Sequence, residues 1–242
     1  MLGLMSSEWF KLRKSKVLSL LLVAPLIGLL GGLAGSIPGM EGINEWYGKI
    51  VMMNFSYGVL LLPLITGVFA AVICRYEHQE GGWKQLLALP VTRGNVYLAK
   101  FLVLILMMLV MQLLYLGSIY LVGTIGAITD PFPMDIVWKS ILGGWVATFP
   151  LIALQLWFSL IFNSFAMPFA INVIFTIPNI LVLNSEKFSP FYPWSQPFLM
   201  MNIGGSAEDF FFVPWEQVLT AVGGSFLLFF IAGYLYLQRK AV

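Results

Sequence analysis

Charged side chains are scarce in this sequence: only 10% of its 242 residues are Asp, Glu, Lys or Arg, whereas 60% are hydrophobic. A soluble domain of ordinary composition carries about 25% charged residues, because its surface must be hydrated. So few charges exclude a water-soluble protein of this length. The chain has room for six or seven helical membrane spans, since each span needs about 20 apolar residues.

Reactive side chains are equally scarce. Cys74 is the only cysteine and His78 the only histidine. One cysteine forms neither an intrachain disulfide nor a cysteine-based metal cluster, and no Ser–His pair or carboxylate pair falls within the apolar runs to support catalysis. The P-loop pattern G-x-x-x-x-G-K-[ST] is missing, so ATP and its magnesium would be bound by another subunit. We therefore expect no enzymatic activity, no cofactor or metal on this chain, and no nucleic-acid partner.

Long runs without charge mark the membrane-spanning segments, because an ionised side chain at mid-bilayer costs at least about 2.5 kcal/mol. One run, residues 140–185, is long enough for a helical hairpin that turns near Asn163 and Ser164. The sequence thus predicts an all-α, polytopic membrane protein, built as a single transmembrane domain over residues 1–242. The predicted spans are 17–40, 50–74, 98–127, 139–162, 166–185 and 217–238.

The basic residues are distributed unevenly between the two sides of these spans. If the N-terminus is cytoplasmic, ten of the 13 Lys and Arg residues fall inside, and most of the acidic residues fall outside. Cytoplasmic loops of membrane proteins carry such an excess of Lys and Arg. The distribution therefore predicts that both termini are cytoplasmic.

The first 16 residues have the pattern of an amphipathic helix. Leu2, Met5, Trp9 and Leu12 recur at helical spacing, with polar residues between them. Such a helix would lie on the inner leaflet, where its basic residues meet anionic lipid; the alternative is a plain positive-inside signal without a separate function. The residues assigned to this membrane surface are Trp9, Lys11, Arg13, Lys14 and Lys16.

The cytoplasmic loop 75–97 contains a second short helix. After Gly81 and Gly82, an apolar face is formed by Trp83, Leu86 and Leu87, and Pro90 would end the helix. An exposed apolar face needs a partner. Membrane lipid or a hydrophobic groove on a cytoplasmic protein would serve.

The outer segment 186–216 is rich in proline and aromatic residues and is too apolar for a hydrated loop. We predict a re-entrant or interfacial extracellular cap, which is tolerated at membrane depth only where the protein satisfies its backbone. The uncharged runs contain polar side chains, such as Asn172, but no ionisable groups at mid-membrane. These polar groups suit interhelical hydrogen bonds or a transport pathway, so a secondary transporter or channel that does not use ATP stays an alternative.

Two segments resemble ABC-2-type permeases of small bacterial exporters. The first is the opening stretch Ser7-Glu8-Trp9-Phe10-Lys11-Leu12-Arg13-Lys14-Ser15-Lys16, and the second is Glu77-x3-Gly81-Gly82-x3-Leu86-Leu87-x2-Pro90-Val91-x-Arg93, followed by Lys100 at the third span. In its size and overall organisation, the chain looks most like permeases of lantibiotic and antimicrobial-peptide immunity systems.

This resemblance implies a six-helix permease in a bacterial plasma membrane, paired with a second copy or a related permease and with two ABC ATPase subunits. It implies ATP-driven export of an antimicrobial peptide or another amphipathic or lipophilic cargo. The short cytoplasmic helix would be the coupling helix. The residues that would dock on the ATPase are Glu77, Gly81, Gly82, Trp83, Leu86, Leu87, Pro90 and Arg93.

Overall fold

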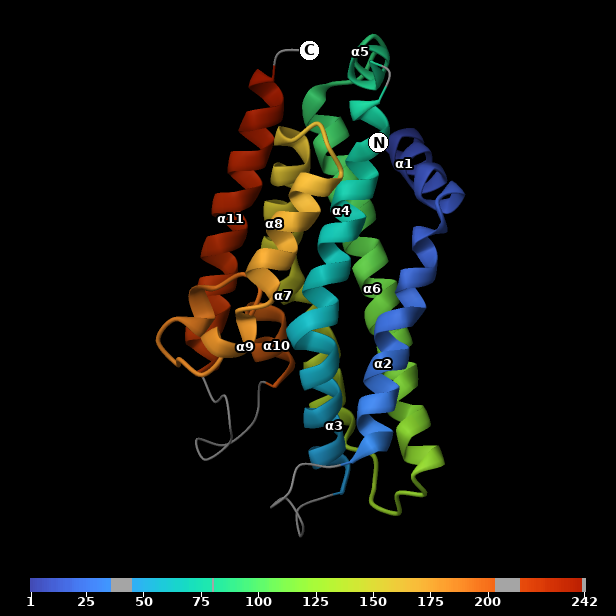
Figure 1. Cartoon of the computed structure of the whole chain (residues 1–242), viewed down its shortest axis with the longest axis vertical. Coiled ribbons are helices and arrows are strands. Elements are labelled where there is room, and N and C mark those ends of the chain that lie inside the picture. Colours follow the sequence, from blue (N-terminus) through green and yellow to red (C-terminus); the bar gives the residue numbers. More distant parts are fainter. Residues whose placement is uncertain (36–44, 80, 203–213, 241–242) are drawn as a thin grey trace.

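Long apolar helices dominate the fold (Figure 1). The computed structural model describes residues 1–35, 45–79, 81–202 and 214–240, and within these ranges every regular element is a helix, which confirms the all-α prediction. The long helices are α2 (Leu20–Ala34), preceded by the 3-10 turn η1 (Lys16–Ser19); α3 (Glu45–Ser56) and α4 (Leu62–His78), joined by the π-helical turn η2 (Tyr57–Leu61); α6 (Arg93–Ile125); α7 (Met134–Ile161); and α11 (Trp215–Arg239).

Five helical stretches are long and apolar enough to cross a membrane. They overlap five of the predicted spans. The third stretch begins at Arg93 rather than at residue 98, and the second continues to His78. Residues 36–40 of the first predicted span lie outside the described residues. The five stretches are Lys16–Ala34, Glu45–His78, Arg93–Ile125, Met134–Ile161 and Trp215–Arg239.

The predicted span 166–185 forms two shorter helices, α8 (Ala166–Thr176) and α9 (Asn179–Val182). Pro178 lies between them, and because proline has no backbone N–H, it cannot donate to the carbonyl four residues earlier. The apolar stretch Ala166–Val182 is shorter than the five long ones. A sixth membrane crossing therefore stays a prediction.

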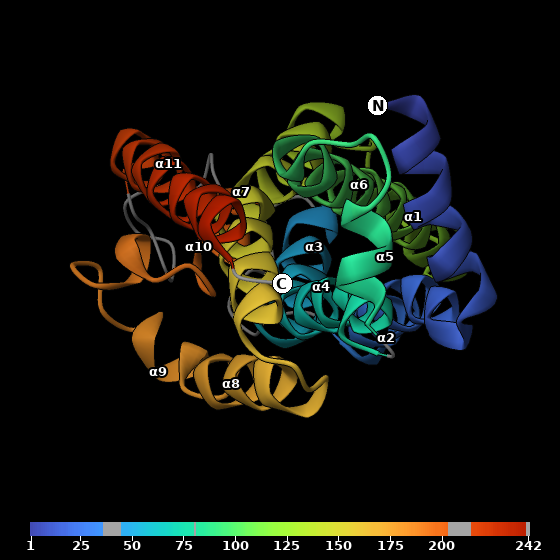
Figure 2. The same ribbon diagram turned by 90° about the horizontal axis from the view of Figure 1, so that it is seen from above.

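Two short helices lie at the end of the bundle that also holds both chain termini (Figure 1). They are α1 (Leu2–Lys14), which packs on α6 and α4, and α5 (Gly82–Leu87), which follows α4. Viewed from above, α1 lies along one edge of the bundle, and α8, α9 and α11 lie toward the opposite side (Figure 2).

A proline within the second long helix explains one buried polar contact. Pro63 has no N–H, so the carbonyl of Val59, in the π-helical turn η2, receives no hydrogen bond from residue 63. The Asn179 side chain donates to this Val59 carbonyl instead, at 2.8 Å, and also donates to the Trp194 carbonyl at 3.0 Å. Asn179 thus ties α9 to the α3–α4 helix.

The described part of the predicted cap, residues 186–202, packs among the long helices. It contains η3 (Ser189–Phe191) and α10 (Gln196–Met201), and every residue of α10 is buried. Glycines permit this approach: a Cβ on Gly143 of α7 would lie 2.7 Å from the Met200 carbonyl oxygen. The Gln196 side chain donates to the Pro190 carbonyl at 2.9 Å, so the segment supplies some of its own hydrogen bonds. The remainder of the predicted cap, apart from 214–216, lies outside the described residues.

Candidate functional site

The helix α5 begins at Gly81 and Gly82, and the backbone at both positions favours glycine. Gly81 has φ +73°, in the left-handed region that favours glycine. A Cβ on Gly82 would lie 2.6 Å from the Tyr76 carbonyl oxygen and 2.9 Å from Glu77 Cα. The chain therefore turns sharply after α4 and places α5 directly against the end of that helix.

The apolar face of α5 is covered by this chain itself. Trp83 is only 6% exposed, its indole N–H donates to His78 Nδ1 at 3.3 Å, and Leu86 packs against the main core. The opposite face is open: Leu89 just beyond the helix is 55% exposed. Besides Leu89, the exposed residues of this segment are Gly81, Lys84, Gln85, Ala88 and Pro90.

His78 joins three helices. Its Nε2 lies 2.7 Å from the carbonyl oxygen of Ser159 in α7, while its Nδ1 accepts from Trp83 in α5. The Trp83 indole is a donor only, so Nδ1 must be the unprotonated nitrogen, and Nε2–H donates to Ser159. A neutral imidazole is the form that satisfies both contacts.

The end of α11 also reaches α5. Lys240 donates to the Leu160 carbonyl at 2.6 Å, and its ammonium lies 5.1 Å from the centre of the Trp83 ring. Partial burial lowers the pKa of Lys240 below its usual range. Arg93 donates to three carbonyls at the end of α11, including that of Gln238 at 3.1 Å, and so caps that helix.

A cluster of four charged residues ties α1 to α4 and α6. Lys100 is fully buried and contacts Glu8 at 2.8 Å and Glu77 at 2.9 Å, and it also donates to the Ile73 carbonyl. Lys11 contacts the same two carboxylates, at 2.8 Å and 2.5 Å. Two ammonium groups thus balance two carboxylates. Glu77 Oε2 is buried without a hydrogen-bond partner.

The N-terminal helix α1 is held to the bundle in part by one polar and one apolar buried side chain. The buried residues of α1 are Glu8 and Leu12, whereas Leu2 is 84% exposed and Trp9 is 43% exposed. Of the predicted membrane-surface residues, Lys11 pairs within the chain, and Arg13 and Lys16 are exposed. Lys14 is the last residue of α1.

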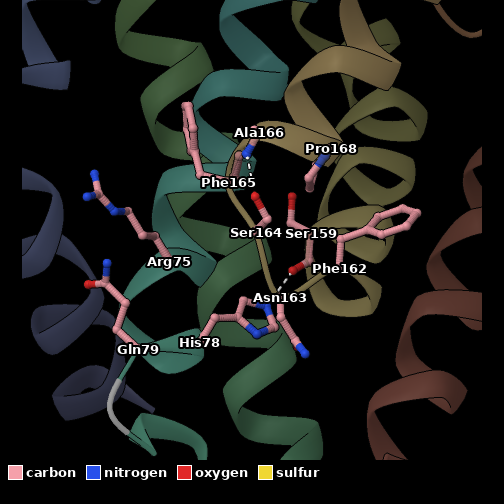
Figure 3. Close-up of a pocket in the computed structure, with 11 residues that line it drawn as sticks. Arg75, His78, Gln79, Ser159, Phe162, Asn163, Ser164, Phe165, Ala166 and Pro168 are labelled. Atoms are coloured by element: carbon pink, nitrogen blue, oxygen red, sulfur yellow. Dashed lines mark hydrogen bonds between the residues drawn. The ribbon is translucent and has the colours of Figure 1, made fainter.

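A cavity of about 480 Å³, lined by both polar and apolar residues, lies between the end of α4 and the turn that joins α7 to α8 (Figure 3). Arg75, His78 and Gln79 come from α4 and the residue after it, and the facing wall includes Asn163 and Ser164. Figure 3 shows His78 directed toward this turn. The remaining lining residues are Ala71, Ser159, Phe162, Phe165, Ala166 and Pro168.

The eight residues predicted to dock on an ATPase therefore occupy different environments. Gly81 and Pro90 are exposed, and Leu87 is partly buried. Glu77 and Trp83 are buried within the chain, Gly82 packs on α4, and Arg93 caps α11. Leu86 packs on the core.

Sequence reasoning missed Glu8 and Lys100 as an ion pair and placed Glu77 in a loop. The acidic Glu8 within the apolar pattern of the N-terminal segment was the available signal, because a carboxylate beside apolar residues calls for a cation. Nothing in the sequence indicated that Lys100, 92 positions later, would supply it.

One polar side chain of the uncharged runs, Asn172, makes several hydrogen bonds to other parts of the helical bundle. Asn172 of α8 accepts from Gln155 and from Trp194, each at 2.8 Å, and donates to the Pro63 and Leu64 carbonyls of α4. It is fully buried. This arrangement supports helix packing, the first of the two roles considered for these side chains.

The fold and these contacts define a class: a multi-pass helical membrane protein whose short helices α1 and α5 pack on the ends of its long helices. The model of the ABC-2 family transporter proteins matches residues 4–179, which is well over half of the chain. The chain therefore belongs to the ABC-2 transporter family. Its members are membrane components of transporters, are not themselves catalytic, and normally work with ABC ATPase subunits. Among curated proteins, no relative matches this chain at a significant level.

Proposed function

We propose that this chain is the permease subunit of an ATP-driven exporter in a bacterial plasma membrane, with both termini cytoplasmic. Two ABC ATPase subunits would bind ATP and magnesium, and a second copy or a related permease would complete the complex. The chain itself would carry no cofactor and no enzymatic activity.

One observation carries this proposal: α5 is anchored on one face and open on the other. Trp83 holds it to His78 of α4, and His78 contacts Ser159 of α7. Lys240, just after α11, lies over the same indole. A displacement of α5 by a bound protein would therefore act on the ends of three long helices.

The docking surface we propose consists of the exposed residues of this segment together with the partly buried Leu87. Of the eight docking residues that the family resemblance implies, this surface includes three: Gly81, Leu87 and Pro90. Glu77, Gly82, Trp83, Leu86 and Arg93 would position the helix. The proposed surface is Gly81, Lys84, Gln85, Leu87, Ala88, Leu89 and Pro90.

The proposed cargo is an antimicrobial peptide or another amphipathic or lipophilic molecule, moved outward for immunity or export. The long helices expose broad apolar faces, including Leu106 of α6 and Leu228 of α11. Such faces suit a cargo that partitions into the membrane better than an inorganic ion.

A second candidate is a proton-coupled secondary transporter. Glu77 and Lys100 favour it, because ionisable groups buried in spanning helices often mark proton pathways. Transport that is abolished by an uncoupler and needs no ATPase would select this candidate.

Purification of the chain from its native cells in mild detergent tests the first candidate. We expect a P-loop ATPase to co-purify in stoichiometric amount, with ATPase activity that responds to amphipathic peptides or lipids. Co-purification of no ATPase, together with uncoupler-sensitive transport, would contradict the exporter and support the second candidate.

Substitution of the open face gives a sharper test. Leu89→Asp places a charge on the proposed docking surface, and we expect ATPase binding to weaken about tenfold, or ~1.4 kcal/mol. The measurement is the dissociation constant of the ATPase from the reconstituted permease.

Ser7→Asp is the matched control, since Ser7 is an exposed residue of α1 at the same end of the bundle. It adds the same charge outside the docking surface. Equal weakening by both variants, or by neither, would remove the docking role from this face.

A further inference from the structure

The cavity in Figure 3 combines a cation and several hydrogen-bond donors with apolar residues, which is the chemistry of an anion site beside a membrane. We propose that it binds the phosphate headgroup of an anionic phospholipid from the leaflet at this end of the bundle. This binding site does not depend on the proposed ATPase partner.

Charge is the first argument. Arg75 lines the cavity, and none of the described residues that line it is acidic. Among the described residues, no carboxylate forms an ion pair with Arg75, whereas Lys11 and Lys100 are each paired with two carboxylates. A guanidinium presents several N–H donors in a plane that matches the oxygens of a phosphate. Within the described part of the chain, Arg75 is thus a cation without an acidic ion-pair partner, in a recess that no described carboxylate lines.

Hydrogen-bond donors around Arg75 are the second argument. Gln79 and Asn163 are exposed amides that line opposite walls of the cavity, and Ser164 adds a hydroxyl beside Asn163. Each amide has two N–H donors. Figure 3 shows Gln79 projecting from its helix on the same side as Arg75. Together these residues give the cavity lining several donors, which suits an anion with several acceptor oxygens.

Size and surroundings distinguish a lipid from a soluble phosphate. The volume of about 480 Å³ exceeds that of a phosphate ion and suits a headgroup with its glycerol. Phe165, which lines the cavity, is 37% exposed, and the nearby Met167 is 50% exposed. Exposed apolar side chains continue along α8 with Ile174, which is 63% exposed. The acyl chains would lie along this helix while the phosphate contacts Arg75.

The cavity lies next to the residue that anchors α5. His78 lines the cavity and also accepts the hydrogen bond from Trp83. A bound headgroup would therefore contact the residue that anchors α5.

Quantitative lipid binding to the purified chain tests the proposal. The probes are phosphatidylglycerol, phosphatidylcholine and inorganic phosphate, each titrated into delipidated protein in neutral detergent and measured by native mass spectrometry. We expect saturable binding of phosphatidylglycerol, and we expect Arg75→Gln to weaken it about tenfold, since it removes a charge-assisted hydrogen bond.

Arg13→Gln is the matched control, because Arg13 is an exposed cation of α1 outside the cavity. It should leave phosphatidylglycerol binding unchanged, and Asn163→Ala should weaken it in a protein that keeps its wild-type elution volume. Equal losses in the Arg13 and Arg75 variants would mean a diffuse surface attraction and would overturn the site. Inorganic phosphate that displaces the lipid at equal concentration would assign the cavity to a soluble phosphate instead. Unchanged binding by folded Arg75→Gln would also overturn it.

Discussion

Lys100→Met is expected to destabilise the folded protein by about 3–5 kcal/mol, because it leaves two buried carboxylates with only one cation. Lys100 is fully buried and contacts both Glu8 and Glu77. Methionine has a similar length but cannot replace the charge or the hydrogen bond to the Ile73 carbonyl. The loss is measured as the shift in an unfolding curve of the purified protein in detergent.

Two further variants separate charge balance from packing. Glu77→Gln combined with Lys100→Met leaves Glu8 facing Lys11, and we expect this pair of changes to restore part of the lost stability. Lys139→Met removes a cation whose pair with Asp135 is at 4.0 Å and exposed, so its effect should stay below about 1 kcal/mol. If Lys100→Met cost no more than Lys139→Met, the cluster would have no structural role.

Gly67→Ala should be the second most damaging single change. A Cβ at this position would lie 2.1 Å from Asn172 Nδ2 and 2.5 Å from its Cγ. Asn172 cannot turn away without losing its bonds to Gln155 and Trp194. We expect a loss of about 2–3 kcal/mol, since buried polar groups would be left unsatisfied. The loss is measured by the same unfolding assay, with faster proteolysis of 186–202 as an independent sign.

Gly224→Ala is the control for this change. Gly224 also lies within a long helix, α11, but nothing lies within 4 Å of the Cβ it would gain. Alanine is favoured over glycine in helices by up to about 1 kcal/mol, so stability should hold or rise slightly. A Gly67→Ala protein as stable as the Gly224→Ala protein would show that the Asn172 contacts contribute little.

The short helix α5 shows how far sequence periodicity reaches. The spacing of Trp83, Leu86, Leu87 and Pro90 predicted a helix after two glycines with one apolar face, and α5 occupies Gly82–Leu87. The same spacing suggested that this face meets lipid or another protein. In the structure, Trp83 meets His78 and Lys240 of its own chain. Periodicity identifies a face that must be covered, but it contains no information on which surface covers it.

The predicted span 166–185 shows a second limit. An uncharged run of sufficient length predicted a helix over 166–185, but Pro178 divides the run into α8 and α9. Asn179 then finds its partners in Val59, 120 positions earlier, and in Trp194. Hydropathy measures only the cost of charge in lipid, so it does not distinguish a complete span from a shorter, broken helix supported by its neighbours.

The sequence by itself determined the class of this protein. Charge must stay out of the hydrocarbon and backbone groups must bond within a segment, so long uncharged runs become helices regardless of their neighbours. The tertiary structure decided the partners: Lys100 with Glu8 and Glu77, and Arg93 with the end of α11; it also placed Arg75 at an open cavity. Such pairings join residues far apart in the chain. They depend on which helices pack together, which local periodicity leaves open.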